Sequence, residues 1–291
     1  MTIRRSALIL PVLAAGAVAL VVSRQRVRAS QEPKGRLRSS WTQVNSWLMH
    51  SRVSVGPVSH ALPVVLVHGY GVSGSYMIPI ARRIAAEFPT FVPDLPGHGR
   101  SEKPERTLDI PELAETLRSW MDAVGLGRVA FLANSMGCQI VAELAVRYPE
   151  RVERIIFVGP TADPEARTVA EHLPRFLRTG LAERLSLPFL LLGDYLRARP
   201  RRAVEELNVM FEDHIEDKLP RIEAPSMVLR GERDHIVPQR WAEEVAERLG
   251  ADRMITIPAM GHALNYSAPD ELIRFIRPFL RAGDRELRER S

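Results

Sequence analysis

The chain has 291 residues, of which 45% are hydrophobic and 26% are charged, and these proportions exclude an intrinsically disordered protein. The length suits one large α/β domain or two small domains, and the single cysteine, Cys138, excludes an internal disulfide. Taken over the whole chain, the formal net charge of +5 would favour an anionic partner such as nucleic acid or a membrane surface.

The positive charge is confined to the N-terminal part of the chain. Residues 1–60 hold nine Lys or Arg and one acidic residue, a net charge of +8. Residues 61–291 hold 31 basic and 34 acidic residues, a net charge of −3. Because the body has no excess of positive charge to neutralise phosphates, we expect that it does not bind nucleic acid.

Residues 1–23 are predicted to form a membrane anchor or a signal segment. Eighteen uncharged residues, Ser6 to Ser23, would span roughly 27 Å as a helix, close to a hydrocarbon core of about 30 Å. The apolar part is longer than the core of a typical signal peptide, and basic residues follow it. This favours a single uncleaved helix that holds the protein at a membrane over a cleaved signal that would release a secreted protein.

Residues 24–48 are predicted to be a basic linker, and residues 282–291 a charged tail. Six Lys or Arg lie between residues 24 and 38, against two before the apolar run. The positive-inside rule would keep such a linker cytoplasmic, whereas export as a signal anchor would oppose that rule. The side of the membrane that the body faces stays open.

From residue 49 onward, short apolar runs alternate with helical patterns. Strands separated by helices of about 10–15 residues indicate an α/β fold with a mostly parallel, doubly wound sheet. Strands are predicted at residues 49–55 (an edge strand), 63–67, 90–93, 129–133, 154–158, 226–230 and 253–257. Helices are predicted at residues 109–124, 136–148, 239–249 and 270–280.

Residues 161–221 interrupt this alternation, because they show helical patterns and no strand. The patterns cover residues 171–177, 181–196 and 201–213. We predict a helical cap inserted between two strands of a core formed by residues 49–160 and 222–281. Such a cap would lie over the carboxyl ends of the strands, where open α/β sheets bind ligands. The alternative is that these helices simply pack on the sheet.

The strongest local signal is the segment Phe131 to Gly137, with the sequence FLANSMG. It approximates the G-x-S-x-G nucleophile elbow, with Ala133 in place of the first glycine. A sharp turn between strand and helix would expose the Ser135 hydroxyl at a helix N-terminus, where free N–H groups favour developing negative charge. The alternative is a serine that only caps the helix.

A nucleophilic serine needs a base, and the base in turn needs an orienting acid. His262 directly follows the last predicted strand, and Asp234 follows the strand before it. Because the carboxyl ends of parallel strands share one sheet edge, we predict that Ser135, Asp234 and His262 form a catalytic triad. Asp163, which follows strand 154–158, is an alternative acid.

The loop after strand 63–67 has the sequence HGYG, from His68 to Gly71. The backbone N–H groups of Tyr70 and Met136 are predicted to form the oxyanion hole, which stabilises the negative charge of the transition state. His68 is predicted to brace this loop, and His98 is predicted to be a structural loop residue as well.

These motifs resemble those of the α/β-hydrolase superfamily over residues 49–281. They are closest in pattern to capped serine hydrolases, which include esterases, lipases and the C–C bond hydrolases of aromatic-ring degradation. Serine at position 135 disfavours the relatives with an aspartate nucleophile. The resemblance implies that no metal or organic cofactor is needed, and the sequence has no metal-ligand spacing such as H-E-x-x-H. The matching segments are HGYG at 68–71, DLPGHGRSEKP at 94–104, ANSMG at 133–137, RGERD at 230–234 and GH at 261–262.

We therefore predict a serine hydrolase that cleaves small carboxylic esters through an acyl-enzyme intermediate. The same triad could serve a C–C bond hydrolase or a thioesterase, and the fold does not separate these reactions. A binding protein that kept the fold without catalysis is the alternative of a different class. The sequence does not predict an oligomeric state. Apolar residues of the cap suggest a substrate with a hydrophobic acyl or alkyl group: Leu181, Leu185, Leu187, Phe189 and Leu190.

Overall fold

The computed structural model describes residues 35–56, 61–180, 183, 187 and 200–282. The predicted N-terminal anchor, residues 1–23, and all but the first residue of the predicted tail lie outside these ranges. Within the described ranges, none of the helices combines the length and the hydropathy that a bilayer crossing requires.

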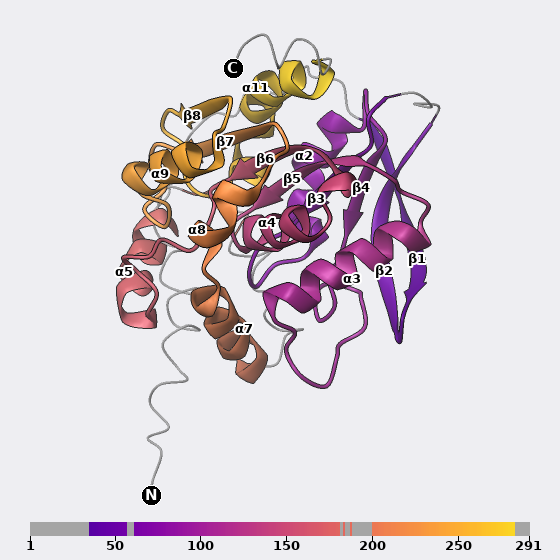
Figure 1. Cartoon of the computed structure of the whole chain (residues 1–291), viewed down its shortest axis with the longest axis horizontal. Coiled ribbons are helices and arrows are strands. Elements are labelled where there is room, and N and C mark those ends of the chain that lie inside the picture. Colours follow the sequence, from indigo (N-terminus) through magenta and orange to yellow (C-terminus); the bar gives the residue numbers. More distant parts are fainter. Residues whose placement is uncertain (1–34, 57–60, 181–182, 184–186, 188–199, 283–291) are drawn as a thin grey trace, which may run out of the picture.

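One eight-stranded sheet forms the centre of the molecule, with the strand order β1-β2-β4-β3-β5-β6-β7-β8 (Figure 1). The β1–β2 and β2–β4 pairs are antiparallel, and all other neighbouring strands are parallel. The mostly parallel sheet predicted from the sequence is thus confirmed. The strands are β1 (Arg36–Val44), β2 (Trp47–Val55), β3 (Val64–Val67), β4 (Thr90–Pro93), β5 (Val129–Asn134), β6 (Val152–Val158), β7 (Ser226–Gly231) and β8 (Arg253–Ile257).

The N-terminal edge of the sheet differs from the prediction. Residues 24–48 were expected to be a linker, but β1 occupies residues 36–44 of this range and pairs along its whole length with β2. The predicted edge strand, now β2, therefore lies second from the edge. Val44 is the only residue of β1 that is fully buried. An edge strand takes its hydrogen bonds from its neighbour and needs few apolar side chains, so its polar sequence was mistaken for a linker.

Helices cover both faces of the sheet and make a three-layer sandwich (Figure 1). The alternation of side chains along β5 shows why: Phe131 and Ala133 enter one hydrophobic cluster, and Ala130 and Leu132 enter the other. The first cluster includes α3 (Ile110–Ala123), α4 (Met136–Arg147), α8 (Ile215–Lys218) and α9 (Gln239–Leu249). The second includes α2 (Ile78–Ile84), α10 (Leu264–Ser267) and α11 (Pro269–Arg281). The described residues also form three short 3-10 helices: η3 (Gly74–Met77), η4 (Pro149–Arg151) and η5 (Leu219–Arg221).

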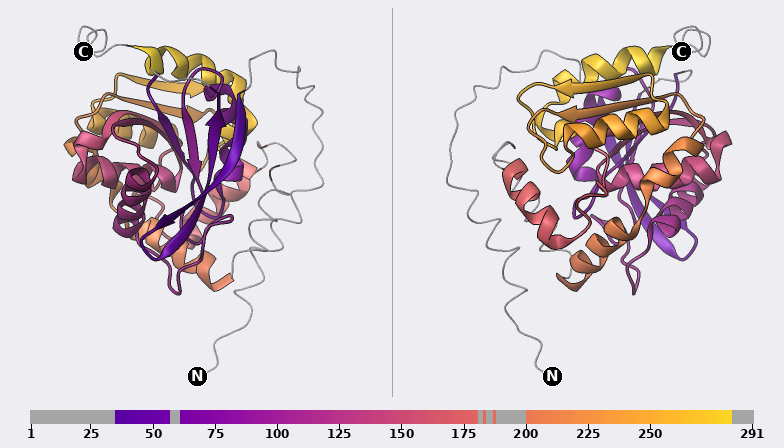
Figure 2. Two further views of the ribbon diagram at one scale, coloured as in Figure 1. Left: turned by 90° about the vertical axis from the view of Figure 1, so that its right-hand side faces the viewer. Right: turned by 60° about the vertical axis from the view of Figure 1, so that its left-hand side comes forward.

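Two helices of the interval 161–221, α5 (Val169–Gly180) and α7 (Pro200–Glu212), lie at one end of the sheet (Figure 2). The C-terminal part of α7 reaches the first cluster through Met210 and Phe211. In α7, the Ala203 carbonyl accepts a hydrogen bond of 3.0 Å from the Tyr70 hydroxyl in the loop after β3. In α5, the Thr179 hydroxyl accepts one of 2.9 Å from the backbone N–H of His235, in the loop after β7. Both helices therefore contact loops at the carboxyl ends of the strands. Most of the predicted helix 181–196 lies outside the described residues.

Phe157, in β6, is fully buried in the core between the sheet and its helices, whereas Phe275, in α11, is 40% exposed. We expect Phe157→Ala to lower the free energy of unfolding by about 3–5 kcal/mol, because it leaves a cavity that neighbouring side chains cannot fill. Phe275→Ala, the matched control, should cost less than half as much. Urea unfolding followed by circular dichroism measures both, and equal losses would contradict this placement of the core.

Candidate active site

Ser135 sits in the sharp turn between β5 and α4, with backbone angles φ 56° and ψ −127°. A positive φ is unfavourable for a residue with a side chain, so the surrounding structure must hold it in place. The backbone N–H of Ser135 donates to the Val158 carbonyl at 3.1 Å, and the Ser135 carbonyl accepts from Cys138 at 2.8 Å. This geometry is the strand–turn–helix conformation that the sequence predicted.

The turn needs small residues because other backbone segments pass directly against it. A Cβ atom at Gly137 would lie 2.6 Å from the Val67 carbonyl oxygen. A Cβ atom at Gly69 would lie 2.8 Å from the Cβ of Ser135. Ala133, which replaces the first glycine of the motif, is fully buried, with its methyl group in the core cluster that includes α4. An alanine is therefore accommodated at this position.

His262 and Asp234 are in contact, as predicted. The Nδ1 atom of His262 lies 2.7 Å from Oδ2 of Asp234, and the Asp234 side chain is fully buried. The other oxygen, Oδ1, accepts the backbone N–H groups of Ile236 at 2.9 Å and Val237 at 3.0 Å. The buried Arg230 side chain donates to the Asp234 carbonyl at 2.8 Å. The loop after β7 thus fixes one carboxylate oxygen and leaves the other for the imidazole.

Burial by itself lowers the pKa of His262, but the charge and hydrogen bond of Asp234, together with the charge of Glu183, outweigh it and raise the pKa above its ordinary value. The imidazole is not sealed off, because 12% of its side-chain surface remains exposed. A histidine with a raised pKa and a partly accessible ring is a good proton acceptor that a reactant can reach.

Gly159 shows how closely these groups converge. It follows Val158, whose carbonyl accepts the N–H of Ser135. A Cβ atom at Gly159 would lie 2.9 Å from the His262 ring and 3.2 Å from Oδ2 of Asp234. The Ser135 turn and the Asp234–His262 pair therefore meet at the end of β6, on one edge of the sheet.

The predicted oxyanion-hole residues border the same turn. Met136 is the first residue of α4, and Tyr70 directly follows Gly69, which packs against Ser135. The Tyr70 hydroxyl is used elsewhere, because it donates to the Ala203 carbonyl in the cap. The Tyr70 hydroxyl is therefore part of the contact between the loop after β3 and α7.

His68 and His98 form a pair of imidazoles whose ring centres are 4.9 Å apart. His68 Nε2 accepts the backbone N–H of Leu95 at 3.1 Å, so its proton lies on Nδ1, which faces the Gly69 carbonyl at 3.0 Å. Burial, and then the charge of His98, lower the pKa of His68 to about 4. A neutral ring with both nitrogens engaged is not a general base, which agrees with the bracing role expected for His68.

His98 links the loop after β4 to the cap. One ring nitrogen lies 3.2 Å from the Pro96 carbonyl, and the other is hydrogen-bonded to the Glu206 carboxylate in α7. Burial lowers the pKa of His98, but Glu206 outweighs this and raises it overall. His98 thus has the structural place expected for it, and its partner in the cap was not predicted.

Asp163, the alternative acid, is occupied elsewhere. Its carboxylate is hydrogen-bonded to Arg175 in α5 and, at 2.6 Å, to Arg240 in α9. Burial raises its pKa, but these guanidinium groups outweigh that and hold it below the ordinary value. Asp163 therefore ties α5 to the core, while the contact with His262 comes from Asp234.

Two further side chains near His262 were missed by the sequence analysis, and both come from the interval 161–221. The Glu183 carboxylate accepts the backbone N–H of Ala263, next to His262, at 2.8 Å. His172, in α5, has a pKa lowered to about 4, first by burial and then by the charge of His262. Neither residue lies in a sequence motif, and helical periodicity does not predict the orientation of the cap helices relative to the sheet. No sequence signal could have identified them.

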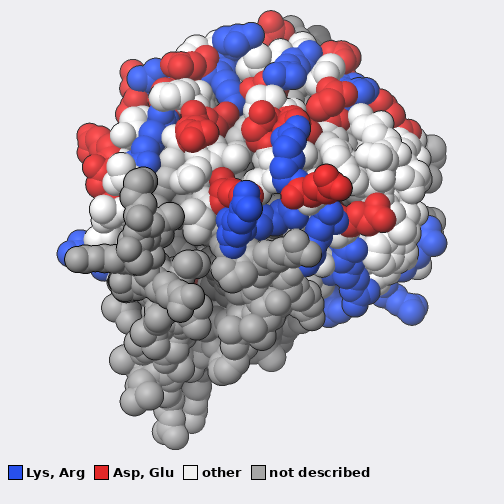
Figure 3. All heavy atoms as spheres, turned by 90° about the horizontal axis from the view of Figure 1, so that it is seen from below, with Lys and Arg blue, Asp and Glu red and all other residues white. Residues whose placement is uncertain are grey.

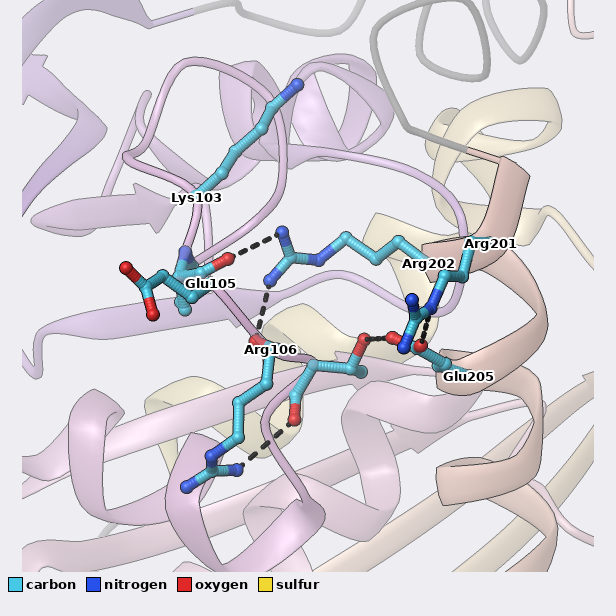
Figure 4. Close-up of a pocket in the computed structure, with 8 residues that line it drawn as sticks. Lys103, Glu105, Arg106, Arg201, Arg202 and Glu205 are labelled. Carbon is cyan, nitrogen blue, oxygen red and sulfur yellow. Dashed lines mark hydrogen bonds and ion pairs between the residues drawn. The ribbon is translucent and has the colours of Figure 1, made fainter.

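A separate cavity lies beside the cap, between residues 103–107 and α7 (Figure 4). Its charged side chains largely bind one another or nearby carbonyls: Arg202 donates to the carbonyls of Pro104 and Arg106, and Thr107 donates to Glu205 at 2.7 Å. The residues that line it include none of the predicted triad. We interpret it as the junction that holds α7 in place.

Seen from the end of the molecule where α5 and α7 lie, basic and acidic side chains are interspersed over the described surface (Figure 3). This face thus carries no broad patch of one sign. Among the residues that the structure describes, no group of three His, Cys, Asp or Glu side chains is arranged to hold a metal ion.

Comparison with known proteins agrees with this geometry. The pimeloyl-[acyl-carrier protein] methyl ester esterase of Neisseria meningitidis serogroup B is 26% identical over 245 residues, which make up 76% of this chain and 93% of that protein. Two solved structures share the fold. The 2-hydroxy-6-oxo-6-phenylhexa-2,4-dienoate hydrolase of Rhodococcus sp. strain RHA1 has a TM-score of 0.69 and 20% identity, covering 85% of this chain and 100% of that one. A thermophilic esterase of Thermogutta terrifontis has a TM-score of 0.69 and 22% identity, covering 87% and 99%.

The sequence profile of the alpha/beta hydrolase family matches residues 64–275, which include every predicted catalytic residue. The match extends over most of the sheet and both of its helix layers. The chain therefore belongs to the alpha/beta hydrolase family.

Proposed function

We propose that this protein is a serine hydrolase that cleaves carboxylic esters with a hydrophobic acyl or alkyl group. The observation that carries the proposal is the Asp234–His262 pair, held at 2.7 Å beside the strained turn that presents Ser135. A buried carboxylate that orients an imidazole next to a partly buried serine at a strand–helix turn is the arrangement that activates a hydroxyl for acyl transfer.

In the proposed reaction, the Ser135 hydroxyl attacks the ester carbonyl while His262 takes its proton. Asp234 stabilises the resulting imidazolium, which then protonates the departing alcohol and leaves an acyl-enzyme. Water, deprotonated by His262, attacks the acyl-enzyme, and the returning proton restores Ser135 as the acid is released. The backbone N–H groups of Tyr70 and Met136 bind the oxyanion in both steps.

The ester bond is supported by the relative from Neisseria meningitidis, which is a methyl ester esterase. A hydrophobic substrate is supported by the apolar composition of the cap; of the predicted apolar set the structure describes Leu187, which is 7% exposed and packs in the cluster that includes α2, α10 and α11. The other four residues of that set lie outside the described ranges. A C–C bond hydrolase is the second candidate, because the Rhodococcus hydrolase shares this fold and the substrate in its name, 2-hydroxy-6-oxo-6-phenylhexa-2,4-dienoate, contains no ester bond.

We further propose that residues 1–23 hold the protein at a membrane as a single helix. The proposal rests on the uncharged stretch from Ser6 to Ser23 and on the basic residues that flank it. A membrane location would bring the cap close to lipid-derived esters. Secretion after cleavage of this segment is the alternative.

We expect Ser135→Ala to lower kcat toward p-nitrophenyl esters by roughly 10⁴–10⁶-fold, because no nucleophile remains to form the acyl-enzyme. A fluorophosphonate probe should label the native protein and not the variant. Ser119→Ala, in α3 and remote from the turn, is the matched control and should keep full activity. Equal turnover by Ser135→Ala and the native protein would refute the proposed nucleophile. A panel of esters, thioesters and vinylogous diketones would identify the preferred bond.

The raised pKa of His262 predicts the pH profile. The base is active only when neutral, so kcat/KM should rise with pH, with a midpoint above the ordinary histidine value of 6.5. Asp234→Asn removes the charge that holds this pKa up, and should shift the midpoint to lower pH. The same change should reduce kcat by roughly 10⁴-fold, because the imidazole loses its orientation. An unshifted midpoint would contradict the role given to Asp234.

Carbonate extraction tests the anchor. We expect the full chain to stay in the membrane pellet at high pH, because a spanning helix resists the treatment. A variant that lacks residues 1–23 should appear in the soluble fraction and keep its esterase activity. Release of the full chain into the supernatant would rule out a spanning helix.

A further inference from the structure

Glu183 adds a second carboxylate to the surroundings of the proposed catalytic base. Its Oε1 atom accepts the backbone N–H of Ala263 at 2.8 Å, and its Oε2 atom accepts the Ser267 hydroxyl at 2.7 Å. Ala263 directly follows His262 and begins the short helix α10. A residue of the interval 161–221 is thereby tied to the loop that carries the imidazole.

The charge of Glu183 reaches several groups around His262. Burial raises the pKa of Glu183 itself; the two hydrogen bonds and His262 oppose this, and the charge of Asp234 adds to it. Burial, and then the charges of Glu183 and Asp234, raise the pKa of Tyr76 in η3. On the α5 side, His172 is kept neutral by burial and by the charge of His262. The charge of Arg175, in α5, also lowers the pKa of His172. Two carboxylates, Asp234 and Glu183, raise the pKa of His262.

We propose that Glu183 is a positioning residue for His262: it fixes the backbone that follows the imidazole and places a second negative charge near it. This inference rests on the proposed function, because it assumes that His262 is the base. It also gives the cap a part in the reaction, since the electrostatic environment of the base then depends on a residue contributed from outside the core sheet.

The charge of Glu183 favours this role over a purely structural one. A structural acceptor for Ala263 and Ser267 needs only a neutral oxygen, whereas a half-buried carboxylate loses part of its hydration and is stabilised by a nearby positive group. The imidazolium that forms during catalysis is such a group. Glu183 and Asp234 would both stabilise it, with Asp234 bound to Nδ1 and Glu183 acting through the adjoining backbone and through its charge.

The decisive variant is Glu183→Gln, which keeps the size of the side chain and an oxygen for the Ala263 N–H but removes the charge. We expect the midpoint of the kcat/KM profile to fall by on the order of 0.5–1 pH unit, because one of the two charges that stabilise the imidazolium is lost. KM should change little. Glu165→Gln, a 66% exposed acid in the same interval, is the matched control and should leave the profile unchanged.

A second measurement does not depend on turnover. In a Ser135→Ala background, the pKa of His262 can be read from NMR titration of its ring proton, with and without Glu183→Gln. We expect the same downward shift as in the kinetic profile. An unchanged pKa would overturn the inference and leave the proposed function intact, whereas activity that survives Ser135→Ala would refute the proposed function itself.

Glu183→Asp distinguishes the effect of the negative charge from the effect of side-chain length. It keeps the carboxylate but shortens the side chain by one methylene, so we expect the pKa of His262 to stay close to the native value while kcat falls. A pKa well below the native value would show that charge alone is not the cause, and would overturn the electrostatic part of the inference. This variant also provides the test if the glutamine variant does not fold.

Discussion

The structure depends on close backbone packing at the carboxyl edge of the sheet. At Gly69, Gly137 and Gly159, a single added Cβ atom would come within 3.0 Å of neighbouring heavy atoms. These contacts pack the loop after β3 against the turn that holds Ser135, and the end of β6 against the Asp234–His262 pair. A backbone with φ 56° at a serine persists because neighbours on each side leave it no room to relax.

This constraint explains which parts of the molecule were predictable. The inner strands are buried on both faces, so uniformly apolar runs in the sequence predicted them. Because these strands are parallel, the residues that follow them lie at one edge of the sheet. That is why Ser135, Asp234 and His262 could be brought together from their positions in the sequence. The strand β1 was not predicted because an edge strand buries few side chains. The contact of Glu183 with the loop after His262 was not predicted because helical periodicity does not give the orientation of a cap relative to a sheet.

The cap is held by polar contacts, each made to a different loop of the carboxyl edge. Tyr70 bonds the Ala203 carbonyl, and His98 pairs with Glu206, so α7 is joined to the loops after β3 and β4. Asp163 pairs with Arg175, so α5 is joined to the segment after β6. Polar contacts of this kind are directional. They fix the position of the cap relative to the site more sharply than apolar packing alone would.

Three histidines at this edge show that the pKa of the same side chain shifts in different directions according to its partners. His68 is buried without a carboxylate partner, so its pKa falls to about 4 and its neutral nitrogen can accept the Leu95 N–H. His98, at 4.9 Å from it, has Glu206, and its pKa rises instead. Two adjacent imidazolium ions would repel each other, so the carboxylate of the cap favours the charged form of His98 over that of His68. His262 follows the same rule with Asp234. Because the pKa of His68 is low, its neutral ring accepts the Leu95 N–H and holds the loop that presents Tyr70. Because Asp234 raises the pKa of His262, this imidazole is a stronger base than His68.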